Sequence, residues 1–145
     1  MSGQGRLLAV DPGEKRIGLA VSDESGTIAN PLQVLTHVSR AADAAAILRI
    51  ANECKVIGIV IGLALGGEGE ETPAARHAAR LADALRERGP LPVFLWDESG
   101  STQEARAARQ ELGLSRKRRA GHQDSLAAAV ILQSYLDANP DSGAV

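Results

Sequence analysis

The chain has 145 residues, of which 44% are hydrophobic and 23% charged, and its formal net charge is −2. This length suits one domain with a single core, and the composition is that of a globular rather than a disordered protein. No apolar run approaches the roughly 20 residues of a membrane span, and no apolar leader stands at the N-terminus. The single cysteine, Cys54, excludes an internal disulfide and a cysteine-based zinc site. We therefore expect a cytoplasmic protein with no membrane partner.

The composition also limits how this chain can contact nucleic acid. The net charge argues against a generically basic binder, although local patches matter more than the sum. The chain has one Phe, one Trp and one Tyr, too few to hold a strand by base stacking. Any such contact must depend on phosphates and shape.

The first predicted elements form a hairpin. Residues Leu7–Val10 are a short apolar run that suits a strand buried on both faces of a sheet. Asp11 follows at the carboxyl end of this strand, Pro12 and Gly13 turn the chain, and Ile17–Val21 is the second strand. Asp11 either caps the turn by accepting hydrogen bonds from the turn amides, or is the first ligand of a metal or phosphate site. This run alone does not decide between the two.

A third strand and the first helix follow. The strand is predicted over Thr27–Leu35, and Pro31 within it indicates a sheet edge or a bulge. Arg40–Cys54 is alanine-rich and predicted to be helical, with Ser39 as its N-cap. Lys55–Ile61 carries the strongest strand signal of the chain and is predicted to be a central, parallel strand.

The middle of the chain is predicted as a loop and a second helix. Residues 62–71 are rich in Gly and Glu but lack the patterns of a P-loop and of a dinucleotide site, so a surface loop is expected. Thr72 caps the helix, which opens with Pro73 at its first position and runs to about Arg88.

The last third of the chain is predicted to hold one strand and two helices. Leu91–Trp96 is the strand, and it ends in the acidic pair Asp97 and Glu98. Ser101–Leu112 begins with a capping box, and Gln123–Leu136 is the final helix. One domain over residues 1–138 is expected, with a polar tail over 139–145. The candidate core contacts of the final helix are Leu126, Val130, Ile131 and Tyr135.

The order of these elements predicts the fold class. Three strands followed by alternating helices and strands indicate an α/β protein with a five-stranded mixed sheet, in which an antiparallel meander joins parallel strands and helices cover both faces. The first, fourth and fifth strands should be parallel and adjacent at the centre. In such sheets the working site lies outside the carboxyl ends of the parallel strands.

Three acidic positions are expected at that edge. Asp11 ends the first strand, Asp97 and Glu98 end the fifth, and Asp124 opens the last helix. Clustered carboxylates repel one another unless a divalent cation neutralises them, and oxygen ligands suit Mg²⁺ or Mn²⁺. Two such ions about 4 Å apart are the common arrangement for phosphodiester cleavage. Each acid also has a structural alternative: Asp124 can be favoured by the helix dipole alone, and the acidic pair can simply solvate a loop.

Four segments of the chain resemble, in order, those of the YqgF (RuvX) proteins, the Holliday-junction-resolvase-like branch of the RNase H fold. These segments are Val10–Gly18, Ile61–Leu65, Asp97–Ala105 and Asp124–Leu136. The resemblance covers nearly the whole chain, and four motifs in order are specific where one would be weak. The chain departs from the family pattern at Ser99-Gly100, Ala64–Gly66 and His122. These departures concern substrate contacts more than the metal site.

The resemblance implies a metal-dependent nuclease. The family is associated with maturation of the precursor of small-subunit (16S) ribosomal RNA, and earlier with resolution of DNA junctions. By resemblance Asp11, Glu98 and Asp124 are catalytic and hold Mg²⁺ or Mn²⁺, expected as two ions. Lys15 stands where the family keeps a lysine, which can contact the scissile phosphate. Whether Asp97 shares the role of Glu98 stays open, and His122 is read as an exposed loop residue in preference to a general acid.

A basic run precedes the last helix. Arg116, Lys117, Arg118 and Arg119 are either a solvated charge run or a strip that contacts phosphates. Their position before Asp124 favours the strip, whose contacts would make binding salt-dependent.

Other functions remain to be weighed against the nuclease reading. Pre-rRNA is the expected partner, with branched DNA as the alternative substrate of a junction resolvase. Actin-like ATPases share the fold and an Asp-x-Gly turn, but they need two such halves to clamp ATP. A non-catalytic nucleic-acid-binding module with structural acids is a further alternative. The sequence leaves the oligomeric state open, a homodimer included.

Overall fold

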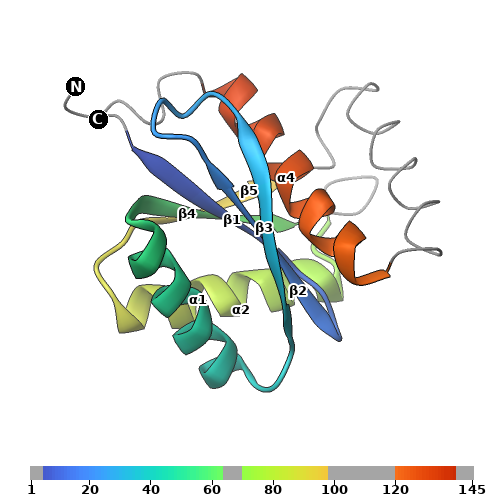
Figure 1. Cartoon of the computed structure of the whole chain (residues 1–145). Helices are drawn as coiled ribbons and strands as arrows, with labels where there is room; N and C mark the ends of the chain where they lie inside the picture. The colour runs from blue at the N-terminus through green and yellow to red at the C-terminus, as the bar shows by residue number, and fades with distance from the viewer. Residues whose placement is uncertain (1–4, 64–69, 98–119, 140–145) are drawn as a thin grey trace.

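The computed structural model describes residues 5–63, 70–97 and 120–139, and of residues 120–124 it describes the backbone alone. Within these ranges no helix has the length and hydropathy that a membrane span requires. The helix predicted over residues 101–112 lies outside the described residues. The elements, as labelled in Figure 1, are β1 (Arg6–Pro12), β2 (Arg16–Ser22), β3 (Ala29–Thr36), α1 (Arg40–Cys54), β4 (Val56–Leu63), α2 (Pro73–Arg88), β5 (Val93–Asp97) and α4 (Ala120–Ala138).

The described strands form one five-stranded sheet in the order β3-β2-β1-β4-β5 (Figure 1). The pairs β1–β2 and β2–β3 are antiparallel, whereas β1–β4 and β4–β5 are parallel. The predicted mixed sheet is therefore confirmed, with the fourth strand inside it. One detail of the prediction is wrong: β5 lies at the end of the described sheet, not at its centre. The hairpin partner β2 occupies one side of β1, so that β1 itself becomes the middle strand.

Strand β3 lies at the opposite edge, as its proline predicted. The register of β2 and β3 shifts between Leu19 and Ala20, where Ala20 pairs with Pro31 and Leu19 with Gln33. Proline has no backbone N–H to donate to a ladder, so an edge strand with an irregular register accommodates it. Both of the expected outcomes, edge and bulge, occur here.

The two helix starts that the sequence predicted are present. The Ser39 hydroxyl accepts a hydrogen bond from the Ala42 amide at 3.1 Å, and the Thr72 hydroxyl accepts one from the Ala75 amide at 3.0 Å. Pro73 is the first residue of α2, where its missing N–H costs nothing.

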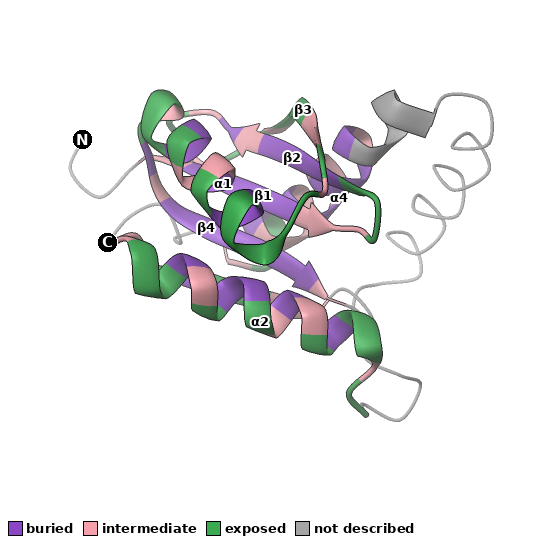
Figure 2. Cartoon of the chain, turned by 90° about the horizontal axis from the view of Figure 1, so that it is seen from below, coloured by how far each residue is buried: buried purple, intermediate pink, exposed green. Residues whose placement is uncertain are grey.

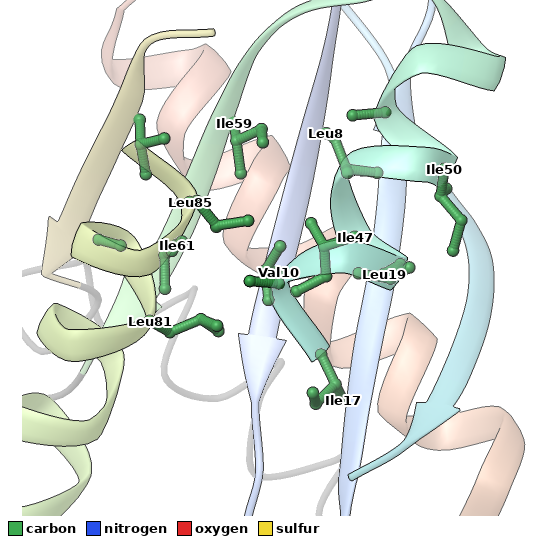
Figure 3. Packing of buried hydrophobic residues seen from close by; sticks show 14 of the residues in the cluster. Leu8, Val10, Ile17, Leu19, Ile47, Ile50, Ile59, Ile61, Leu81 and Leu85 are labelled. Atoms are coloured by element: carbon green, nitrogen blue, oxygen red, sulfur yellow. The ribbon is translucent and has the colours of Figure 1, made fainter. Parts of the chain in front are cut away.

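The sheet has a helical layer on each face. Helices α1 and α2 cover one face, and Figure 2 shows α2 with its buried side toward the strands and its exposed side outward. Helix α4 covers the other face, where it contacts β1, β2 and β3. Successive residues of β1 alternate between the two cores, so that Leu8 and Val10 pack with α1 and α2 while Leu7 and Ala9 pack with α4. Figure 3 shows the first core, where strand residues meet Ile47, Ile50, Leu81 and Leu85 of the two helices.

The contacts predicted for the last helix are correct only in part. Ile131 is buried and the half-buried Tyr135 packs against the second core, whereas Leu126 and Val130 are only half-buried. The second core is built instead on a stripe at four-residue spacing. A helix that is apolar nearly all round does not reveal from its sequence which face meets the sheet. The stripe consists of Ala128, Leu132 and Leu136.

Candidate functional site

The hairpin between β1 and β2 sets the position of Asp11. Asp11 lies within β1, one residue before its end, and pairs with Gly18 of β2. The turn closes through a 3.1 Å hydrogen bond from the Gly13 amide to the Arg16 carbonyl. A Cβ on Gly13 would lie 2.4 Å from that carbonyl oxygen, so only glycine fits here. The Gly13 amide, one of the turn amides expected to cap Asp11, therefore donates to the Arg16 carbonyl instead.

Strand alternation decides which face Asp11 occupies. Leu7 and Ala9 pack in the core under α4, so Asp11, two residues further along the strand, lies on the α4 face. Its partner Gly18 has no side chain. On the other side of β1 the parallel register pairs Val10 with Ile61, and its next step places Gly62 beside Asp11. On both neighbouring strands the residue directly beside Asp11 is therefore a glycine, and the Asp11 carboxylate is half-buried.

Asp97 lies at the same edge of the sheet but on the other face. It ends β5 and pairs with Leu63. The preceding residue, Trp96, packs on α4: its indole N–H donates to the Ser134 hydroxyl at 3.2 Å, and its ring lies 5.4 Å from that of Tyr135. Because neighbouring strand residues point to opposite faces, Asp97 lies on the α1–α2 face. The sequence predicted that Asp11 and Asp97 lie at the same edge of the sheet. It did not predict that they lie on opposite faces.

Helix α4 runs along the sheet between its two edges. Its Gln133 amide group bridges to the chain before β3, accepting from the Ala29 amide at 3.0 Å and donating to the Thr27 carbonyl at 2.9 Å. Ala29 pairs with Ser22, whose hydroxyl accepts from the Leu7 amide at 2.9 Å. Gln133 thus lies level with the amino end of β1. Figure 1 shows α4 beginning on the side where β1 and β2 join and ending toward the start of β1.

The start of α4 differs from the prediction. The helix begins at Ala120, three residues earlier than Gln123. Asp124 is therefore the fifth helical residue, and the first turn holds no acidic residue. The alternative in which a helix dipole alone favours Asp124 loses its basis, because the dipole effect falls off within the first turn. His122 belongs to the same helix, so its assignment to a loop was wrong.

The remaining predicted site residues are described unevenly. Lys15 is exposed at the hairpin tip, where its carbonyl accepts a 2.9 Å hydrogen bond from the His37 amide. Glu98 and Arg116–Arg119 lie outside the described residues. Among the described residues no group of three His, Cys, Asp or Glu residues could hold a metal ion. Of the three predicted ligands, those residues include the side chain of Asp11 alone.

A polar cluster that no sequence motif indicated lies at this edge on the α1–α2 face. The Asp43 carboxylate, only 4% exposed, accepts from the Val38 amide at 3.0 Å and contacts Nδ1 of His37. The His77 ring of α2 meets the His37 ring edge-on, with centroids 6.3 Å apart. Burial, followed by the positive charges of Arg40 and His37, lowers the pKa of His77. The sequence signal for this cluster was Asp43 in the first turn of α1, where an acidic residue usually only stabilises the helix dipole.

The chain is similar in sequence to a known protein family and to named bacterial proteins. A family model described as "RuvX: Holliday junction resolvase" matches residues 5–138. A protein of Paracoccus denitrificans named "Putative pre-16S rRNA nuclease" is 41% identical over 133 residues, which cover 92% of this chain and 84% of that protein. A protein of the same name from Anaeromyxobacter sp. is 42% identical over 132 residues, covering 91% of this chain and 96% of that protein.

Solved structures agree on the fold. RuvC of T. thermophilus in complex with a Holliday junction substrate is similar with a TM-score of 0.60 at 16% identity, covering 95% of this chain and 97% of RuvC. The fowlpox virus Holliday junction resolvase is similar with a TM-score of 0.54 at 11% identity, covering 92% and 98%. The predicted RNase H-like fold is thereby confirmed. With a family match that spans nearly all of its length and relatives more than 40% identical, the chain belongs to the RuvX family.

Proposed function

We propose that this protein is a nuclease that hydrolyses phosphodiester bonds in structured nucleic acid, with the precursor of 16S ribosomal RNA as its substrate. Its family and its resolvase-like fold are those of nucleases, and relatives that match nine-tenths of the chain carry the pre-16S rRNA name. The observation that carries the proposal is the position of Asp11, a half-buried carboxylate at the carboxyl edge of the parallel strands on the α4 face.

The catalytic acids that we propose are Asp11, Glu98 and Asp124. We propose Glu98 rather than Asp97 for this set, and the position of Asp97 on the face opposite to Asp11 supports that choice. For Asp124 the support is the position of α4. Asp124 precedes Gln133 by nine residues, about 13 Å of helix, and Asp11 follows Leu7 by four residues, about 13 Å of strand. Since Gln133 lies level with Leu7, the backbone of Asp124 lies at about the level of Asp11.

The proposed acids fit a divalent ion. Nucleases of this fold generally use divalent metals, and carboxylate oxygens are the ligands that Mg²⁺ and Mn²⁺ prefer. Asp11 brings a half-buried carboxylate to this edge, with glycines directly beside it on both neighbouring strands. We propose two ions, Mg²⁺ or Mn²⁺, which together supply an activated water and stabilise the leaving oxygen. Lys15, exposed four residues after Asp11 on the same hairpin, is proposed to contact the scissile phosphate.

The basic run Arg116–Arg119 is proposed as a phosphate-contact strip. Its support is sequence position, directly ahead of the helix that carries Asp124. Neutralising two of these residues should make the slope of log affinity against log salt shallower by about 0.7–0.9 per lost contact. An unchanged slope would identify the run as solvated.

The test of the function is cleavage with matched variants. The wild-type protein is incubated with structured RNA, single-stranded RNA and a four-way DNA junction, each with Mn²⁺ or Mg²⁺ and each with a chelator. We expect metal-dependent cleavage of structured RNA, its near-complete loss in Asp11→Asn, and its retention in Asp97→Asn, the control at the same edge on the opposite face. Cleavage confined to the junction would assign a resolvase instead, and binding without cleavage under all conditions would indicate a non-catalytic module.

A further inference from the structure

The α1–α2 face carries a second feature at the edge where Asp11 lies. The segment after β3 is tied to the hairpin tip, because the His37 amide donates to the Lys15 carbonyl at 2.9 Å. The same segment is tied to α1, because the Val38 amide donates to Asp43 and the His37 ring contacts that carboxylate. These contacts hold the tip of the hairpin and the first turn of α1 in a fixed relation. Figure 1 shows β3 running into α1 at this side of the molecule.

Helix α2 completes the feature. His77, in its second turn, lies against His37. Arg40 at the start of α1 and Arg80 on α2 are both close enough to act electrostatically on His77. Arg80 follows His77 by three residues, which places the two side chains on neighbouring parts of the helix surface. Lys15, Arg40 and Arg80 are all exposed. Two exposed cationic side chains, those of Arg40 and Arg80, therefore lie near His77, and Lys15 is joined to the same segment through its backbone carbonyl.

The charged groups around the two histidines differ in exposure. The Asp43 carboxylate is buried and already hydrogen-bonded by the Val38 amide and the His37 ring, so it is not presented to solvent, whereas Arg40 and Arg80 are. Glu71 lies 3.9 Å from Arg76, another basic residue of α2, and offsets that residue rather than Arg40 or Arg80. Helices α1 and α2 both begin at this edge, so the positive ends of their dipoles add to the same field.

We propose that Arg40 and Arg80 form a phosphate-contact surface for the nucleic-acid substrate, here called the α1–α2 phosphate surface. It rests on the proposed function, and it adds a contact on the face opposite to Asp11. A strand whose scissile phosphate lies over the carboxyl edge would continue across the hairpin tip onto this face. Arginine and lysine bind phosphate oxygens without reading sequence, which suits a chain with so few aromatic residues.

The experiment is a salt titration of binding without cleavage. Affinity for fluorescently labelled structured RNA is measured by anisotropy in chelator, between about 50 and 200 mM salt. The test variant is Arg40→Gln with Arg80→Gln. The matched control is Arg49→Gln with Arg88→Gln, which removes the same charge from the same two helices near their other ends. Melting curves establish that both variants fold.

Two lost phosphate contacts should make the log–log salt slope shallower by about 1.4–1.8. Over this fourfold range of salt the wild type should then lose about ninefold more affinity than the test variant. The control variant should keep the wild-type slope, and Arg40→Lys with Arg80→Lys should restore it. In cleavage, the test variant should raise KM with little change in kcat, because these contacts are the same in the ground and transition states.

Each contrary result has a distinct meaning. If the wild type binds steeply and the test variant keeps its slope, the α1–α2 phosphate surface is wrong and the nuclease assignment stands. If the control variant loses as much slope as the test variant, the effect is one of net charge and the surface is again wrong. If the wild type does not bind the structured RNA, both proposals fail.

Discussion

Asp43 is a buried carboxylate whose partners all come from a short stretch of chain ahead of it. Its carboxylate accepts a hydrogen bond from the Val38 amide at 3.0 Å and contacts the His37 ring. Its helix, α1, is capped by Ser39. A carboxylate in this position is tolerated because it is hydrogen-bonded, and it organises the junction between β3 and α1. Beside it lies His77, whose pKa is lowered because burial and neighbouring positive charges disfavour its protonated form.

At the residue scale, His77 should make stability depend on pH. Burial first, then the charges of Arg40 and His37, lower its pKa from 6.5, while Asp43 opposes the shift. The unfolded chain therefore binds the proton more readily than the folded one. The free energy of unfolding that is linked to His77 is therefore at its full value above about pH 6.5. It declines as the pH falls from there toward the lower pKa of His77 in the folded state.

The measurement is urea unfolding of the wild type and His77→Gln at several values between about pH 7.5 and 5. The wild type should lose more stability than the variant on acidification, since Gln does not titrate. The comparison removes the background titration of the other histidines. Parallel curves for the two proteins would mean that His77 titrates alike in the folded and unfolded chains.

At the scale of the element, the hairpin depends on one glycine. A methyl group on Gly13 would lie 2.4 Å from the Arg16 carbonyl oxygen, which is backbone and cannot rotate away. Gly13→Ala should therefore break the closing hydrogen bond and cost about 1–3 kcal/mol of unfolding free energy. It should also impair cleavage, because the hairpin carries both Asp11 and Lys15.

The matched control is Gly89→Ala. A Cβ there would meet only Leu48 side-chain atoms at 3.7 Å and beyond, and its φ of −160° is extended backbone that alanine adopts. Chemical denaturation should place this variant within about 1 kcal/mol of the wild type. If both substitutions lower the free energy of unfolding equally, the backbone at Gly13 shifts to accept a Cβ at no extra cost.

At the scale of the whole molecule, the proposed acids come from segments that are far apart in the chain. If Asp11, Glu98 and Asp124 share metal ions, their charges repel one another in the metal-free protein. Asp11→Asn, Glu98→Gln and Asp124→Asn should then leave the metal-free melting temperature unchanged or raise it, while each removes nearly all cleavage. A double variant should be scarcely worse than a single one, because the acids act as one unit.

Melting curves in chelator beside Mn²⁺-dependent cleavage test this. A marked drop in melting temperature for Asp11→Asn would make Asp11 a structural cap of the hairpin. Normal melting with normal cleavage would remove Asp11 from the metal site.

The sequence by itself determined the features that local chemistry controls. Ser39, Thr72 and Pro73 mark helix starts because their roles involve backbone groups within three residues. Pro31 marks an edge strand because a missing N–H is a property of one residue. The apolar run before Asp11 marks a buried strand for the same local reason. The order of these signals was enough for the mixed sheet and for the edge that carries Asp11.

Only the tertiary structure decided which face each residue occupies. Val93–Trp96 is apolar on both sides, so its sequence could not separate Asp97 from Glu98. The indole contact of Trp96 with α4 fixes Asp97 on the other face. Helix α4 is apolar nearly all round, so only its packing on the sheet decides that Ala128 belongs to the buried stripe.

The histidine cluster is the clearest case. His37 and His77 are forty residues apart and belong to no shared motif. They meet because α1, which begins just after His37, and α2, which carries His77, pack together on one face of the mixed sheet. Contacts across such a separation depend on the crossover geometry of the whole fold, and no local pattern of residues encodes that.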